Sequence, residues 1–382
     1  MAQYFTERLQ KVFHMIFKSY NQEMAQEGLR QLELIVNNQH SPEQPNHRAL
    51  RNDMTTSLEN EIDTKEDALK IANDPEAREI ADAYALLARI YAGPRFTWEE
   101  SNFPENNMRT YQCLHDSIRR CSPIGNLQAL RINGTITPTV EKDMLISFDD
   151  AFRIVYNYAE QGDAFCQYII GNVFFWRDDD RISLAREMIT PPRLSWAKRI
   201  QQSLQKGSIQ ERLAALQGTV SDETLQENAT TFAKEWFNKA LNNGLAMFQG
   251  NLRNIYIDEG DFENARRVAR TAANLGNPAM MLYTGLDCHE NGNFEDAFTW
   301  FTKAAALGQS ESIAELADYY YHFYDAKELR STIPYDPVKA IGLYRRAATK
   351  NFSDAGYTAL QAVFGYIFHI GHLPLDWASL QT

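Results

Sequence analysis

Phe232-Ala-Lys-Glu-Trp-Phe-Asn-Lys-Ala-Leu-Asn-Asn-Gly244 is a stretch that the chain repeats without gaps from Asn264 and again from Asp296. The three copies share small residues at one spacing of 32 residues, namely Ala233, Ala265 and Ala297 near the start and Gly244, Gly276 and Gly308 at the end. Two residue types that recur with a single period predict an internal structural repeat.

Weaker copies lie on both sides of these three. Lys339–Asn351 follows after an insertion of 11 residues, with Asn351 in the place of the glycine. An earlier copy runs from Asp150 to Gly162, and Ser195–Gly207 is a candidate for a degenerate copy. The repeat pattern therefore weakens towards the N-terminus.

Each copy is expected to form the second helix of an antiparallel pair. Its alanines allow two helices to approach closely, and large side chains such as Trp300, Phe301 and Tyr344 fill the space between neighbours. The closing glycine suits a left-handed residue after a helix C-terminus. Asn291-Gly292-Asn293 is expected to turn the chain between the two helices of one pair.

A single helical pair cannot bury its own apolar face, so successive pairs are expected to stack on one another. The sequence thus predicts an all-α fold, a superhelical solenoid of antiparallel helical hairpins with essentially no sheet. Three regions are expected: a divergent helical region at 1–125 with a flexible loop at 38–62, degenerate helical repeats at 126–228, and regular repeats with a C-terminal capping helix at 229–382.

The spacing of small and aromatic residues resembles that of a known repeat family. Gly285, Phe294, Ala297, Phe301 and Ala304 coincide with the characteristic positions of a tetratricopeptide repeat. The endings in paired alanines and a glycine are similar to the Sel-one-like subclass. The resemblance implies a protein-interaction scaffold without catalysis of its own, in which the first helix of each pair lines a concave face.

Carrying the family's helix positions onto this chain gives candidate partner-binding residues on that face. They are Met247, Asn254, Ile257 and Asp258 in one unit, Leu282, Leu286, His289 and Glu290 in the next, and Glu311, Asp318, Tyr321 and His322 in the third. Carboxylates and aromatic rings dominate this set, which favours a basic or apolar protein or peptide over an acidic one. The alternative is that Leu282 and Leu286 belong to the core and that partners bind elsewhere.

The chain has 382 residues, with 38 Lys and Arg against 50 Asp and Glu and a formal charge of -12, so nucleic acid is not an expected partner. No secretory signal or membrane span is recognised, which predicts a cytoplasmic protein and leaves secretion by a signal-independent route open.

Phe5, Leu9, Phe13, Phe17 and Tyr20 recur at helical spacing near the N-terminus. This stripe predicts either packing on the rest of the protein or contact with a membrane.

No catalytic residue, cofactor or metal site is predicted. His369-Ile-Gly-His372 has no nucleotide-binding context, the four cysteines show no paired spacing, and Asp178-Asp179-Asp180 is expected to be a solvated loop between helices. Two alternative functions stay open. One is a bacterial effector or regulatory protein whose N-terminal region carries an activity or a membrane contact, and the other is an enzyme hidden among the divergent helices.

Overall fold

The structure is a computed structural model that describes residues 3–37, 64–93, 98, 103–132, 143–191, 205, 208–209, 220–247, 249–321 and 333–350. Throughout these ranges the regular structure is helical and no strand occurs, so the predicted all-α class is confirmed. The predicted loop at 38–62, the capping helix after residue 352, His322 and the His369–His372 motif lie outside the described residues. The predicted three-region division stays a prediction.

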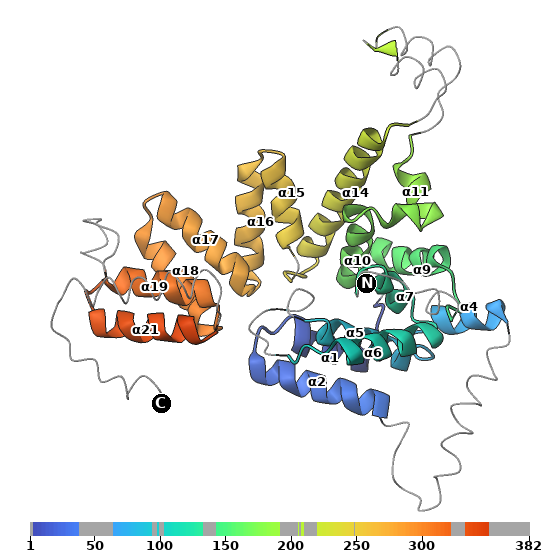
Figure 1. The fold of residues 1–382 in the computed structure, drawn as a ribbon, viewed down its shortest axis with the longest axis horizontal. Helices are drawn as coiled ribbons and strands as arrows, with labels where there is room; N and C mark the ends of the chain where they lie inside the picture. The colour runs from blue at the N-terminus through green and yellow to red at the C-terminus, as the bar shows by residue number, and fades with distance from the viewer. Residues whose placement is uncertain are drawn as a thin grey trace, which may run out of the picture. The chain divides into compact units, whose positions relative to one another are not determined.

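The chain forms two compact units, Met1–Asp261 and Phe262–Thr382, which we call the N-terminal and C-terminal units. The helices of the N-terminal unit, coloured blue to yellow in Figure 1, are α1 (Glu7–Phe17), α2 (Gln22–Asn37), α4 (Lys65–Asn73), α5 (Glu79–Tyr91), α6 (Asn107–Arg119), α7 (Pro123–Ala129), α9 (Phe148–Glu160), α10 (Ala164–Phe175), the 3-10 turn η4 (Asp178–Asp180), α11 (Ser183–Ile189), α14 (Asp222–Asn242) and α15 (Gly250–Asp258).

The apolar stripe of α1 is buried inside the N-terminal unit. α1 packs along α2, and the rings of Phe5 and Phe13 lie 5.7 and 4.8 Å from the ring of Phe165 on α10. Leu9 and Phe17 are fully buried, and Tyr20 is nearly so. Of the two expected roles for this stripe, the structure shows packing against the protein.

A buried ion pair fixes the start of the chain to α5. Arg78, which precedes α5, pairs with Asp82 at 3.0 Å, and both side chains are almost completely inaccessible to solvent. The same guanidinium donates to the backbone carbonyl oxygens of Tyr4 and Ala72. Asp82 in turn accepts hydrogen bonds from the hydroxyl groups of Tyr4 and Ser122. This network joins three segments that are distant in the sequence, those of Tyr4, of residues 72–82 and of Ser122.

α14, which contains the first of the repeated stretches, packs against α10. The contact is close because Gly171 of α10 faces the ring of Phe237 on α14, where a Cβ atom would stand 2.6 Å from the ring. The two helices form a pair although residues 176–221 separate them in the chain. The first helix of this pair is therefore α10, which ends well before the repeated stretch begins.

The described helices of the C-terminal unit are one leading helix and two successive helical pairs, drawn from gold to red in Figure 1. Its helices are α16 (Phe262–Asn274), α17 (Pro278–Glu290), α18 (Phe294–Ala306), α19 (Ser310–Tyr321) and α21 (Pro337–Lys350). Each of them packs on the next, α16 on α17, α17 on α18, α18 on α19 and α19 on α21. The unit thus has the nearest-neighbour packing of a solenoid.

The repeated glycines have the backbone conformation that their position predicts. Gly244, Gly276 and Gly308 have φ values of +81°, +101° and +95°. One residue later, the same backbone hydrogen bond recurs three times, from Leu245, Asn277 and Gln309 to the carbonyl oxygens of Ala240, Ala272 and Ala304. Such a bond satisfies a carbonyl group that the end of a helix leaves without a partner. The expected left-handed glycine is confirmed at all three sites.

Candidate functional site

On α17, the predicted binding residues occupy different environments. Leu282 is buried in the core of the C-terminal unit, and Leu286 is partly buried against the same core. His289 Nδ1 lies 2.7 Å from the hydroxyl group of Tyr319, and burial lowers the pKa of this imidazole. Glu290 is exposed at the end of the helix. The surface that α17 offers to a partner is therefore more polar than the sequence positions alone indicated.

On α19, Glu311 is exposed in the first turn, whereas Asp318 is partly buried. The hydroxyl group of Tyr344 on α21 donates to Asp318, and burial raises the pKa of that carboxyl group to about 6. The ring centroid of Tyr321 lies 6.1 Å from that of Tyr335. Asp318 thus contributes to the packing of α19 on α21 in addition to any contact with a partner.

The remaining predicted residues belong to the N-terminal unit. Met247 is buried just before α15, while Asn254 and Asp258 are exposed on α15 and Ile257 is partly buried. Leu252, Ile255 and Tyr256 form the buried side of the same helix.

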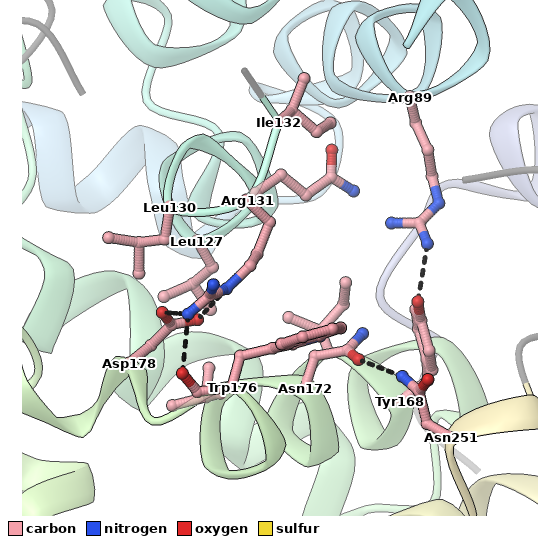
Figure 2. A pocket seen from close by; sticks show the side chains of 13 residues that line it. Arg89, Leu127, Leu130, Arg131, Ile132, Tyr168, Asn172, Trp176, Asp178 and Asn251 are labelled. Carbon is pink, nitrogen blue, oxygen red and sulfur yellow. Dashed lines mark hydrogen bonds and ion pairs between the residues drawn. The ribbon is translucent and has the colours of Figure 1, made fainter. Parts of the chain in front are cut away.

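A pocket of about 480 Å³ is present in the N-terminal unit, and we call it the N-terminal pocket. No motif or spacing in the sequence indicates it. Figure 2 shows the labelled side chains around it, which come from α5, α7 and the turn after it, α10 and the residue that follows it, η4 and α15. Its lining combines apolar, aromatic and polar groups: Arg89, Leu127, Gln128, Leu130, Arg131, Ile132, Tyr168, Ile169, Asn172, Val173, Trp176, Asp178 and Asn251.

Arginines stand at two sides of the N-terminal pocket, each held by a neighbour (Figure 2). Arg89 Nη2 donates to the hydroxyl group of Tyr168 at 2.9 Å. Arg131 Nε donates to Asp178 at 3.0 Å, and its guanidinium carbon lies 5.4 Å from the ring centroid of Trp176. Burial raises the pKa of Asp178 to about 6, against the opposing effect of Arg131.

The aspartate triplet does not form the solvated loop that the sequence predicted. Asp178 and Asp179 are buried, and only Asp180 is exposed. Asp179 pairs with Arg177 at 2.9 Å and with Arg186 at 2.6 Å, and this pairing lowers its pKa although burial alone would raise it. The expectation was wrong because arginines on the adjoining segments neutralise two of the three carboxylates, which makes their burial possible.

Among the described residues, no group of three or more His, Cys, Asp or Glu side chains is arranged to hold a metal ion. In the same part of the chain, no helix has the length and apolar character required to cross a bilayer. The four cysteines, Cys113, Cys121, Cys166 and Cys288, are buried thiols. Burial raises the pKa of each of these thiols, so they remain protonated at neutral pH and are poor nucleophiles.

Comparison with known proteins gives three matched segments: residues 210–245, 269–309 and 310–352 fit the family described as Sel1 repeat. No relative was found among curated proteins. Of solved structures, the chain is similar to a Sel1 repeat protein from Oxalobacter formigenes, with 14% identity, a TM-score of 0.35 and coverage of 72% of this chain and 87% of that one.

The chain is also similar to c5321, a protective antigen present in uropathogenic Escherichia coli strains and displaying an SLR fold. Here the identity is 17%, the TM-score is 0.35, and 76% of this chain and 65% of the antigen are covered. The three matched segments contain Gly244, Gly276 and Gly308 and the whole of the first and third repeated stretches, whereas the second stretch, which begins at Asn264, lies only partly within them. The chain therefore carries Sel1 repeats, and the resemblance to the Sel-one-like helical family is confirmed.

Proposed function

We propose that the repeats of the C-terminal unit bind a protein partner, and that the chain acts as an interaction scaffold without catalysis of its own. Sel1 repeats generally serve as protein-interaction scaffolds. The observation that carries the proposal is that two matched segments fold as successive helical pairs, with carboxylates of the first helices left exposed. A cytoplasmic location, expected from the sequence, is part of the same proposal.

The charge of the first helices supports a basic or apolar partner segment. Glu290 on α17 and Glu311 on α19 are exposed, and each would be paired by a lysine or arginine of a bound helix. Tyr283, exposed by 36%, adds an amphipathic ring on α17. Aromatic side chains are enriched where protein interfaces gain most of their binding energy.

Variants that reverse charge on the first helices provide the test. Affinity capture from native lysate is carried out with the unaltered chain, with the double variant Glu290→Lys/Glu311→Lys and with Glu295→Lys. Glu295 is the matched control because, like Glu311, it is an exposed glutamate in the first turn of a helix, but it lies on α18, a second helix.

We expect the double variant to lose a protein that the unaltered chain and Glu295→Lys both retain. Capture of the same proteins by all three would refute the assignment to this surface. Leu286→Glu is unsuitable as a test because Leu286 packs against the core, so loss of binding would not be distinguishable from loss of folding. The positions on α15 are a separate part of the proposal and need variants of their own.

A further inference from the structure

Gln128 on α7 lines the N-terminal pocket and has a buried side-chain amide without a partner. The residue is only 4% exposed, and within the described part of the chain neither its amide nitrogen nor its amide oxygen makes a hydrogen bond. A buried polar group that lacks a partner destabilises the folded chain, and native structures contain few of them. Such an amide in the lining of a pocket points to a ligand that supplies an acceptor for its nitrogen and a donor for its oxygen.

The shape of the Gln128 amide restricts what this ligand can be. A primary carboxamide is planar and carries its N–H donor and its carbonyl acceptor side by side on one edge. A single ligand group can bond to both atoms only if its own acceptor and donor also lie side by side. Ring amides and primary amides have this arrangement, which we call an amide edge. An open-chain secondary amide lacks it, because it is almost always trans and its N–H and C=O groups point in opposite directions.

The guanidinium groups at the pocket are engaged with other side chains of the protein. Arg131 pairs with Asp178, and Arg89 donates to the hydroxyl group of Tyr168. A ligand without charge requires no change in either contact. Two further carboxamides add uncharged polar groups to the lining, since Asn251 Nδ2 lies 3.5 Å from Asn172 Oδ1 and both residues border the pocket. These observations favour an uncharged ligand.

Much of the lining is suited to an apolar body. Aliphatic surface comes from Leu127, Leu130, Ile132, Ile169 and Val173. The indole of Trp176, which is 50% exposed, borders the space shown in Figure 2. An aromatic ring beside this indole gains from ring packing as well as from the burial of apolar surface. A volume of about 480 Å³ lies within the range of roughly 300–1,000 Å³ that is usual for small-molecule sites.

We infer that the N-terminal pocket binds an uncharged small molecule that carries an amide edge on a flat, mainly apolar body, such as a fused aromatic ring containing a ring amide. Gln128 donates from Nε2 to the carbonyl oxygen of the ligand and accepts from the ligand N–H at Oε1. The body of the ligand contacts the aliphatic wall and Trp176. The lining residues all belong to the N-terminal unit, so this site is separate from the partner-binding helices proposed for the C-terminal unit.

The requirement for an amide edge is tested by titration calorimetry of the full chain with three uncharged aromatic probes. 2-Quinolinone has the edge, N-methyl-2-quinolinone lacks the donor, and acetanilide has the same two groups in the trans arrangement. We expect 2-quinolinone to bind about tenfold more tightly than either of the others, because each of these leaves an atom of the Gln128 amide without a partner. Equal affinity for all three, or binding of none at millimolar concentration, would overturn the inference.

The variant Gln128→Met tests the role of the amide, since methionine keeps the length of the side chain and removes both polar atoms. It should weaken 2-quinolinone binding by about tenfold, abolish the preference over N-methyl-2-quinolinone, and leave the unfolding midpoint equal or higher. The control is Gln10→Met on α1, which also removes a buried amide oxygen without a partner but lies outside the pocket lining. A preference that persists in Gln128→Met would show that another group recognises the amide edge.

The variant Trp176→Ala tests where the body of the ligand lies. The exposed indole is expected to be dispensable for folding, and its loss should weaken 2-quinolinone binding by about threefold to tenfold. Tyr111→Ala is the matched control, because Tyr111 is an exposed aromatic residue on α6, at 39%, and does not line the pocket. Equal 2-quinolinone affinity in the two variants would contradict the placement of the ring beside Trp176.

A glutamine side chain of another protein presents an amide edge from a different source. The uncharged peptide acetyl-Gly-Gly-Gln-Gly-Gly-amide is therefore titrated alongside 2-quinolinone. We expect the peptide to bind more weakly, because its side chain has no aromatic body to place against the aliphatic wall. Tighter binding of the peptide would assign the pocket to a polypeptide and overturn the assignment to a small molecule.

Discussion

Gly285 on α17 lies so close to Phe301 on α18 that a Cβ atom on Gly285 would stand 2.5 Å from the ring carbon Cε1. Gly171 on α10 and Phe237 on α14 repeat this relationship at 2.6 Å. In both pairs a glycine on the first helix receives an aromatic ring from the second. The shared contact identifies α10 and α14 as a helical pair of the same kind as α17 and α18.

Gly285→Ala is expected to destabilise the chain by about 1–3 kcal/mol, because the ring of Phe301 is fully buried and the added methyl group forces the two helices or the ring to shift. The measurement is the free energy of unfolding in urea. Gly342→Ala on α21 is the control, since nothing lies within 4 Å of a Cβ atom there. That variant should stabilise the chain by about 0.5–1 kcal/mol through helix propensity. A similar loss in both variants would contradict the packing explanation.

The second helix of each repeat could be predicted from the sequence because close helix packing requires a small residue, and the helix end a glycine, at the same positions in every copy. Ala233, Ala265 and Ala297 are all buried, and the glycine that closes each stretch is left-handed. The first helix of the α10–α14 pair could not be found in the same way. α10 is apolar on nearly all sides and carries no repeat ending, and residues 176–221 separate it from α14.

The N-terminal pocket could not be predicted from periodicity, since its lining comes from five separate segments. Gln128 and Arg89 have no distinguishing sequence pattern, and only tertiary packing shows that both are buried. Arg78 and Asp82 illustrate the same limit. Their separation by four residues is typical of an exposed ion pair on a helix surface, and yet the structure buries both.

Arg78→Met is expected to destabilise the N-terminal unit by about 3–5 kcal/mol, because it leaves Asp82 buried without its guanidinium partner. Burial already raises the pKa of Asp82 to about 6, so the ionised carboxylate depends on this pairing. The double variant Arg78→Met/Asp82→Asn should recover part of the loss. Thermal unfolding of the three proteins measures both effects, and a double variant less stable than the single one would contradict the assigned coupling.

Gly292, in the turn between α17 and α18, has a φ of +76°, and no atom lies within 4 Å of the place that a Cβ atom would take, so its role is conformational. Gly292→Ala is therefore expected to cost about 1 kcal/mol, the penalty for a left-handed residue with a Cβ atom. Gly292→Asn should cost less, because asparagine tolerates this conformation. Urea unfolding ranks the two variants, and equal losses would indicate that the conformation at this position does not limit stability.

The raised pKa of Asp318 predicts that the free energy of unfolding depends on pH. The single substitution Asp318→Asn separates this dependence from that of the other titratable groups. Burial raises the pKa of its carboxyl group from 3.8 to about 6, although the hydrogen bond from Tyr344 opposes the shift. Between these two pH values the folded chain holds a proton that the unfolded chain has released. The contribution of Asp318 to the free energy of unfolding therefore falls as the pH rises from about 4 to 6 and stays low above that.

Asp318→Asn keeps an acceptor for the hydroxyl group of Tyr344 and cannot ionise, so its own contribution does not change with pH. The stability of this variant relative to the unaltered chain should rise by about 2 kcal/mol between pH 4 and pH 7. Asp82 and Asp178, which have similarly raised pKa values, are present in both proteins and cancel in the difference. Urea unfolding at a series of pH values gives this difference directly. A difference that is constant from pH 4 to 7 would show that Asp318 ionises in the folded chain as it does in water, and that the contact of α19 with α21 does not exclude solvent from it.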